Sequence, residues 1–123
     1  MHGAKNYPLI KERSDLDIPL SDETKDDFYL STLNKQLSAL INGIQPDFIF
    51  YLAGVDVLTS DKLGRISISK SACKQRDEIV FQHCKKYGIP VAVSMGGGYS
   101  PQIKDIVDAH CNTFCAAFEC YED

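Results

Sequence analysis

The stretch "DFIFYLAG", residues 47–54, decides the fold class of this chain. It is a nearly unbroken apolar run after Pro46, as expected of a central strand that is covered on both of its faces. A second run, "IPVAVSM" at residues 89–95, has the same character, and a segment with helical periodicity separates the two runs. Strand, helix and strand in this order predict a βα crossover between parallel strands.

On either side of these strands, helical periodicity predicts three helices. The first runs to about Asn42; we expect Ser21 or Asp22 to cap its start and Gly43 to take the left-handed conformation at its end. Its apolar positions recur at steps of three and four, namely Tyr29, Leu33, Leu37, Leu40 and Ile41. Together with a short strand at Leu16–Leu20 before it, this helix forms the first of three βα units.

The second and third helices complete the other two units. Ser69 is the expected cap of the second helix, which Gly88 ends, and its buried stripe includes Ile79, Val80 and Cys84. In the third helix Ser100 is the expected cap and Pro101 the first helical residue. The apolar stripe of the third helix consists of Ile103, Val107, His110, Phe114 and Phe118. Residues 1–13 lack periodicity and are expected to form a loop.

Composition limits the class of protein. The 123 residues, 44% hydrophobic, fit one domain spanning residues 1–123. A net charge of −4 without a basic stripe disfavours a nucleic-acid partner. We expect a cytoplasmic protein with no membrane partner, because no apolar stretch approaches the roughly 20 residues that span a bilayer and no signal peptide is recognisable. The five cysteines include no Cys-x-x-Cys pair, which favours reduced thiols.

Two loops qualify as functional, because loops after parallel strands meet at the same edge of a sheet. One carries Asp56, and the other carries the glycines at 96–98 followed by Tyr99. Three glycines permit positive φ angles and close approach, which suits a tight turn or a phosphate cradle; a P-loop lysine is absent. An aspartate in such a loop often caps a turn, but a carboxylate beside a phenol also suits metal-assisted hydrolysis.

Four stretches together resemble the C-terminal part of the histone deacetylase family, nearest its class IV and bacterial branch. They are "MHGAKNYPLIKERSDLDIPL" (1–20), "PDFIFYLAGVDVLTSDKLGRISIS" (46–69), "RDEIVF" (76–81) and "GIPVAVSMGGGYS" (88–100). The resemblance implies a three-layer αβα parallel sheet, the C-terminal part of the arginase/deacetylase-like fold. It also implies zinc-dependent hydrolysis of acetylated lysine or another acetylated amine.

The same resemblance assigns roles to individual residues. Asp56, in "AGVD", matches a zinc ligand, and Tyr99, in "GGGY", matches the tyrosine that hydrogen-bonds the substrate carbonyl and then the oxyanion. Gly97 and Gly98 belong to the thin loop beside the acyl-lysine tunnel. Leu63, in "DKLG", matches a tunnel-lining residue, and Tyr7, in "NYP", matches an aromatic wall.

Other parts of the family's site have no counterpart here. The Asp-x-His ligands and the paired histidines match no residues of this chain, so we expect the isolated chain to be inactive. His2 is not expected to act in catalysis, His83 is expected to be solvated, and His110 to be a core histidine. An incomplete sheet would expose strand edges and apolar helix faces, which predicts a homo-oligomer.

We expect several further features to be structural and to have no functional role. Lys74–Glu78, "KQRDE", is expected to be a solvated helix face, and the cysteines of the last helix, Cys111, Cys115 and Cys120, are expected to be partly buried without chemistry. Two alternatives to a deacetylase remain open. One is a non-catalytic α/β module that assembles with itself or with a missing half, and the other is a nucleotide-binding half-domain that uses Gly96–Gly98.

Overall fold

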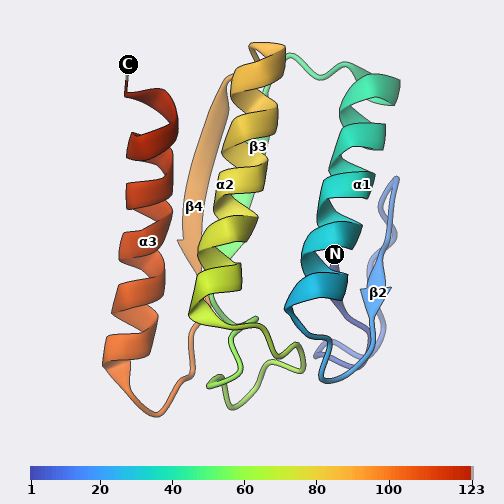
Figure 1. Cartoon of the computed structure of the whole chain (residues 1–123). Coiled ribbons are helices and arrows are strands. Elements are labelled where there is room, and N and C mark those ends of the chain that lie inside the picture. Colours follow the sequence, from blue (N-terminus) through green and yellow to red (C-terminus); the bar gives the residue numbers. More distant parts are fainter. Residues whose placement is uncertain (123) are drawn as a thin grey trace.

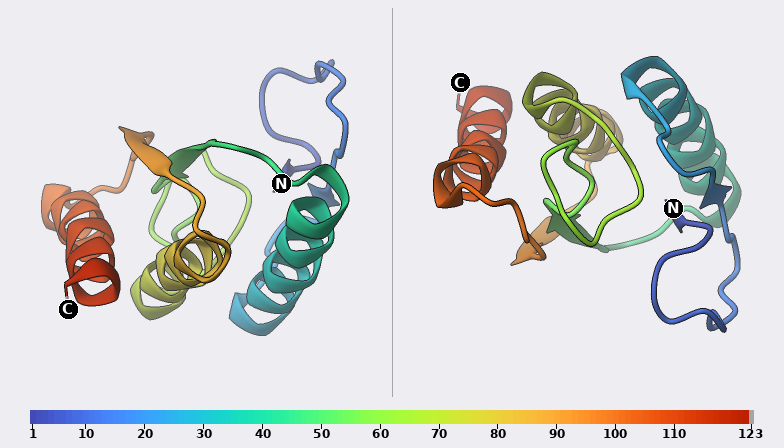
Figure 2. Two further views of the ribbon diagram at one scale, coloured as in Figure 1. Left: turned by 90° about the horizontal axis from the view of Figure 1, so that it is seen from above. Right: turned by 90° about the horizontal axis from the view of Figure 1, so that it is seen from below.

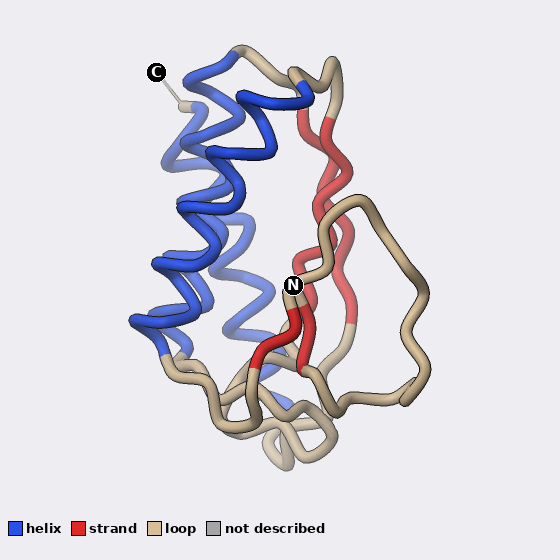
Figure 3. Tube along the Cα trace, turned by 90° about the vertical axis from the view of Figure 1, so that its right-hand side faces the viewer, coloured by secondary structure: helices blue, strands red, loops and turns tan. Residues whose placement is uncertain are grey.

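The computed structural model describes residues 1–122 and contains three long helices beside two short parallel sheets (Figure 1). The elements in chain order are β1 (His2–Gly3), β2 (Pro19–Leu20), α1 (Asp26–Ile44), β3 (Ile49–Gly54), α2 (Lys70–Tyr87), β4 (Val91–Gly96) and α3 (Ile103–Tyr121). The helices form one layer and the strands lie together on one side of it (Figure 3). None of the helices within residues 1–122 combines the length and apolar character needed to cross a membrane.

The predicted crossover is confirmed, because β3, α2 and β4 form a parallel βα unit. Strand β3 pairs with β4 in register from Ile49 opposite Val91 to Gly54 opposite Gly96. The strand predicted at Leu16–Leu20 is reduced to Pro19–Leu20, and it pairs with β1 rather than with β3. The reason lies in the N-terminal segment, where Ala4 N donates to Leu20 O at 2.8 Å and so occupies the edge of β2.

The ends of α2 are as predicted. Ser69 caps its start, with the hydroxyl accepting a hydrogen bond from Ala72 N at 3.0 Å, and Gly88 ends it with φ of 66°. The predicted ends of α1 were wrong. This helix begins after Lys25, and Gln45, with φ of 52°, takes the left-handed position that we expected for Gly43.

The expected cap of α3 was also wrong. The residue before this helix is Gln102, and its side chain makes no capping hydrogen bond. The hydroxyl of Ser100 instead lies 2.7 Å from the hydroxyl of Ser60, in the loop that follows β3. Ser100 therefore joins two loops and does not cap the helix.

The main core lies where α1, α2 and α3 meet the loop after β3. Its buried members are Leu20, Tyr29, Val55, Leu58, Ile66, Ile68, Ala72, Cys73 and Ala109. The predicted stripe of α3 lies outside this core, because Phe114 and Phe118 are each more than 60% exposed. Ala109, Thr113 and Ala116 are the buried residues of α3, and such small side chains let this helix approach α2 closely.

The described residues cover only one face of β3. Phe50 and Leu52 point to the same side of the strand, and they are 81% and 79% exposed. Phe48 stacks beside Phe50 with ring centroids 4.9 Å apart. Seen along the helix axes, α1, α2 and α3 all lie on the opposite side of the β3–β4 pair (Figure 2). Within the described residues β3 is therefore covered on one face only, and not on both faces as its apolar run suggests.

Candidate functional site

The loops that follow β3 and β4 lie together at one end of the sheet (Figure 1). Gly54 ends β3 opposite Gly96, which ends β4, and Val55 N then donates to Gly96 O at 3.0 Å. The backbone pairing therefore continues one residue beyond the strands. This places Asp56 beside the glycine loop, as the parallel arrangement of the strands requires.

Asp56 is half-buried in a space that three glycines leave open. A Cβ at Gly97, whose φ is 67°, would lie 3.1 Å from Asp56 Cβ, and a Cβ at Gly54 would lie 3.0 Å from Asp56 Oδ1. On the other side, a Cβ at Gly64 would overlap the Asp56 carbonyl oxygen at 1.8 Å. The position of Asp56 thus depends on close backbone approach from two loops.

Gly98 closes the glycine loop against the core. With φ of 117° it adopts a conformation that L-residues avoid, and a Cβ there would lie 2.9 Å from Ile106 Cγ2. The carboxylate of Asp56 lies against the neighbouring Gly97, which disfavours a bound phosphate at this loop. The geometry thus fits a thin loop packed closely against the core better than a nucleotide-binding loop.

Tyr99 and Leu63 come from the two loops and are both exposed. The Tyr99 side chain is 60% exposed and the Leu63 side chain 65%. Their backbones share one partner, because Asp61 Oδ2 accepts from Tyr99 N at 2.7 Å and Asp61 Oδ1 accepts from Leu63 N at 2.9 Å. Sequence reasoning missed Asp61, although an aspartate followed by x-Leu-Gly is typical of a side chain that caps its own turn.

A buried ion pair fixes the end of β3, which contradicts the solvated face predicted for Lys74–Glu78. Arg76 is 4% exposed and Asp77 is fully buried. Arg76 Nε donates to Asp77 Oδ1 at 2.9 Å, and Arg76 Nη1 donates to the carbonyl oxygen of Gly54 at 2.5 Å. The pair therefore holds the backbone two residues before Asp56. A local charge pattern could not reveal this, since the stabilising partners come from other elements.

Those partners are Tyr51 on β3 and Thr113 on α3. The Tyr51 hydroxyl donates to Asp77 Oδ1, and Thr113 Oγ1 donates to Asp77 Oδ2 at 2.7 Å. Burial raises the pKa of the Tyr51 phenol far above its ordinary value, so this hydroxyl remains a donor. Burial acts to lower the pKa of Arg76, but Tyr51, Cys73 and Asp77 raise it overall, so the guanidinium stays charged.

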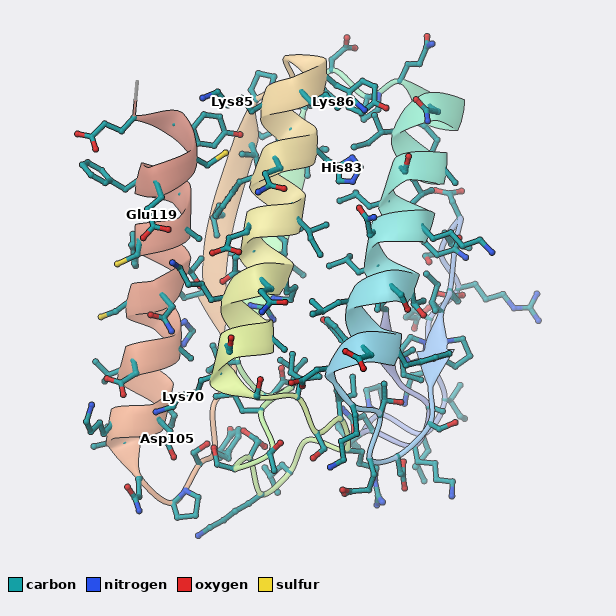
Figure 4. The ribbon with its side chains drawn as sticks, in the orientation of Figure 1. Lys70, His83, Lys85, Lys86, Asp105 and Glu119 are labelled. Atoms are coloured by element: carbon teal, nitrogen blue, oxygen red, sulfur yellow. The ribbon has the colours of Figure 1, made fainter. Side chains whose placement is uncertain are left out.

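Residues 1–122 contain no group of three or more His, Cys, Asp and Glu side chains able to hold a metal ion. Asp56 is therefore one candidate ligand and not a metal site by itself. His2 and His110 are half-buried, and neither forms part of such a group. His83 differs from our expectation of a solvated side chain, because it is half-buried between α2 and α1 (Figure 4), with Nε2 2.8 Å from Asn34 Oδ1.

Tyr7 lies in the loop between β1 and β2, which projects from the side of the sheets (Figure 2). Its side chain is 93% exposed. The described contacts do not join this loop to Asp56 or to Tyr99, so its role as an aromatic wall stays a prediction. The expected partial burial of the last helix's cysteines was right for Cys120, which is half-buried, but wrong for Cys111 and Cys115, which are exposed.

Comparison with solved structures defines the class of fold. The chain superposes on acetylpolyamine aminohydrolase from Burkholderia pseudomallei with a TM-score of 0.80, over 97% of this chain and 36% of that one, at 15% identity. On a histone deacetylase homologue from Aquifex aeolicus the TM-score is 0.77, over 94% and 33% of the two chains, at 22% identity. The chain therefore has an arginase-like α/β fold, as predicted.

The sequence identifies the family. The histone deacetylase domain matches residues 3–114, so the chain belongs to the histone deacetylase family and the predicted resemblance is confirmed. An uncharacterized protein of Picosynechococcus sp. is 39% identical over 98% of this chain and 40% of its own length. Histone deacetylase 2 of Arabidopsis thaliana is 34% identical over 80% of this chain and 26% of its own length. The chain thus spans 40% or less of these relatives.

Proposed function

We propose that this chain supplies one part of a zinc-dependent deacetylase site that acts on acetylated lysine or another acetylated amine. The observation that supports it most directly is the placing of Asp56 against the glycine loop that leads into Tyr99, in a chain of the histone deacetylase family. One solved structure with the same fold is an acetylpolyamine aminohydrolase, which favours an acetylated amine as the substrate class.

In this proposal each residue has a separate task. Asp56 supplies one carboxylate ligand, and a zinc ion held there with further ligands would act as a Lewis acid toward the amide carbonyl. The hydroxyl of Tyr99 donates a hydrogen bond to the oxygen that becomes negative as the amide carbon turns tetrahedral. Gly97 keeps the loop beside Asp56 thin, and Leu63 lines the path of the lysine alkyl chain.

The described residues do not complete such a site, so we expect the isolated chain to be inactive. A catalytic zinc takes three protein ligands and an open position, whereas residues 1–122 contain no group of three His, Cys, Asp or Glu side chains that could hold a metal ion. In this proposal the other ligands and the general base come from outside residues 1–122. Cytoplasmic location is part of the same proposal.

The test uses a chimera in which this chain replaces the matching segment of the Picosynechococcus relative. We expect the chimera, but not the chain alone, to bind zinc stoichiometrically and to hydrolyse an acetyl-lysine peptide. Tyr99→Phe should lower its kcat by about two to three orders of magnitude with zinc retained, the scale of one lost oxyanion donor. Asp56→Asn should instead remove tightly bound zinc, because a neutral amide is a poor ligand.

Two results would refute these assignments. Near-normal turnover of the Tyr99→Phe chimera would exclude the oxyanion role, and unchanged zinc content in Asp56→Asn would exclude the ligand role.

A non-catalytic module that self-associates is the second candidate, favoured by the exposure of Phe50 and Leu52. In that case the chimera would fold without gaining deacetylase activity.

A further inference from the structure

Asp61 joins the two loops of the candidate site through a single carboxylate. Its Oδ2 accepts a hydrogen bond at 2.7 Å from Tyr99 N, which belongs to the loop that follows β4. Its Oδ1 accepts from Leu63 N at 2.9 Å and from Gly64 N at 2.7 Å, within the loop that follows β3. One side chain therefore holds the backbones of the proposed oxyanion donor and of the proposed tunnel residue.

The same carboxylate also acts on the position of Asp56 through Gly64. The Cα of Gly64 packs so closely on the Asp56 carbonyl oxygen that a Cβ would overlap it at 1.8 Å. The hydrogen bond from Gly64 N to Asp61 thus restrains the residue against which the Asp56 carbonyl group packs. Asp61 is in turn anchored by its own amide, which donates to Leu58 O at 2.9 Å in the core.

Two other contacts join the same loops. Tyr99 O accepts from Lys62 N at a long 3.4 Å. The hydroxyl of the neighbouring Ser100 lies 2.7 Å from that of Ser60. The Asp61 carboxylate is the group that holds the Tyr99 amide itself.

The Tyr99 side chain is 60% exposed, and the preceding Gly97 and Gly98 gain freedom from the lack of a Cβ. A donor to a developing oxyanion must lie within about 2.7–3.1 Å of that oxygen, so small displacements of the backbone matter. Hydrogen bonds to a charged carboxylate are shorter and stronger than neutral ones, which suits this anchoring task.

We propose that Asp61 is a positioning residue, which sets Tyr99 and Leu63 relative to Asp56 by holding their backbone amides on one carboxylate. This inference rests on the proposed deacetylase function and deepens it. The simpler alternative is that Asp61 only caps its own turn, through Leu63 N and Gly64 N. The two explanations differ in what happens at Tyr99.

The first measurement is amide hydrogen exchange, followed by NMR, on the 123-residue chain. Asp61→Asn can keep Oδ1 for Leu63 N and Gly64 N, but it turns an NH2 group toward Tyr99 N. We therefore expect exchange at the Tyr99 amide to accelerate by at least about tenfold, the scale of a lost charge-assisted bond, with little change at Leu63 and Gly64. Asp61→Ala should accelerate exchange at all three amides.

The matched control is Asp17→Asn, because Asp17 also accepts from a backbone amide, Ser14 N at 3.2 Å, in a different loop. This variant should leave exchange at Tyr99 unchanged. Unaltered Tyr99 exchange in both Asp61 variants would show that Asp61 only caps its turn, and it would overturn the inference.

The second measurement is a double-mutant cycle in the chimera described above. Asp61→Asn should lower kcat at least about tenfold while leaving zinc content and the melting temperature close to those of the parent. In a Tyr99→Phe background the same change should cost less than about twofold, because residues that act through one another are not additive. A general structural defect would give the same loss in both backgrounds, and that result would overturn the inference.

The two proposals can fail separately. If Tyr99→Phe removes turnover while Asp61→Asn does not, the positioning role is wrong and the deacetylase function stands. If Tyr99→Phe itself has no effect, the oxyanion role of Tyr99 fails and the positioning role in catalysis fails with it, whereas a chimera without any deacetylase activity would refute the proposed function.

Discussion

The Asp77 carboxylate receives hydrogen bonds from three elements, although nothing in its sequence neighbourhood sets it apart. Tyr51 approaches from β3, Arg76 from α2 itself and Thr113 from α3. Full burial of such a charge is tolerated only when its lone pairs are satisfied. The Arg76–Asp77 pair also restrains the backbone of the candidate site, because Arg76 donates a hydrogen bond to the carbonyl oxygen of Gly54.

We predict that Asp77→Ala lowers the free energy of unfolding by about 3–5 kcal/mol, since it leaves the buried Arg76 charge without its partner. Urea denaturation of the purified chain measures this directly. Thr113→Val, which removes one hydrogen bond to the buried carboxylate and keeps the shape, should cost about 1.5–3 kcal/mol. A loss below about 1 kcal/mol in Asp77→Ala would mean that water, and not Asp77, satisfies Arg76.

His83 gives the fold a dependence on pH. Burial, and then the positive charge of Lys86, lower the pKa of His83 below its ordinary value of 6.5. The folded chain therefore binds fewer protons at this residue than the unfolded chain once the pH drops below that value. The stability associated with neutral His83 is present above about pH 6.5 and is lost as the pH falls toward the lower, folded-state pKa.

We predict that the unfolding free energy falls less between about pH 7.5 and about pH 5 in His83→Gln than in the parent chain, because glutamine does not titrate. Denaturation at both pH values gives the comparison. His2 and His110 are unchanged in the variant, so their contribution cancels. An identical drop in both proteins would assign the pH dependence to groups other than His83.

At the scale of elements, helix ends were predictable where one local bond decides them. Ser69 and Gly88 end α2 as expected, because a capping hydroxyl and a left-handed glycine act within one turn of the chain. Helix α1 ends at Gln45 and not at Gly43. Pro46 disfavours the right-handed helical region for Gln45, so the helix stops before it. The left-handed turn at Gln45 is closed by its own amide, which donates to Ile41 O at 2.9 Å.

The α2–α3 contact shows why helix faces were harder to predict. Exposed ion pairs join the two helices, such as Lys70 with Asp105 at 3.0 Å (Figure 4). Lys74 and Glu119 form another at 2.8 Å, but pairs of this kind stabilise little. Close packing through small residues such as Ala116 does more. A reading of hydrophobicity alone selects the large apolar residues of α3, which remain exposed.

Ser69 stabilises more than its own helix. Its hydroxyl accepts from Ala72 N and donates to Asp26 Oδ2 at 2.7 Å, at the first turn of α1. We predict that Ser69→Ala costs about 1–2 kcal/mol in unfolding free energy, at the upper end for a lost cap. Ser71→Ala, an exposed change in the same first turn, should alter it by less than about 0.5 kcal/mol. Equal effects of the two changes would contradict a capping role.

At the scale of the whole molecule, the family and the α/β fold were predictable because they rest on ordered motifs along the chain. The placement of Asp56 and Tyr99 in adjoining loops was also predictable, since the carboxyl ends of parallel strands meet at one edge of the sheet. The carboxylate that joins these loops, Asp61, escaped prediction because its contact with Tyr99 N spans 38 positions. The burial of Arg76 escaped for the same reason.

The uncovered face of β3 presents two large apolar side chains to solvent, since Phe50 and Leu52 are 81% and 79% exposed. Adjacent exposed side chains of this size favour association, because burying each one contributes roughly 1.5–3 kcal/mol. We expect the isolated chain to form homo-oligomers whose sedimentation coefficient rises with concentration. The double variant Phe50→Gln, Leu52→Gln should weaken association by at least about a hundredfold in Kd, which corresponds to about 3 kcal/mol.

The matched control is Phe118→Gln on the exposed side of α3, where Phe118 is 62% exposed. If association uses β3, this control should leave the sedimentation coefficient as it is in the parent chain. If Phe118→Gln alone dissociates the oligomer, the interface lies on α3 and not on the sheet. A parent chain that sediments as a monomer at every concentration would contradict the prediction, because the uncovered apolar surface would then be stable in water without a partner.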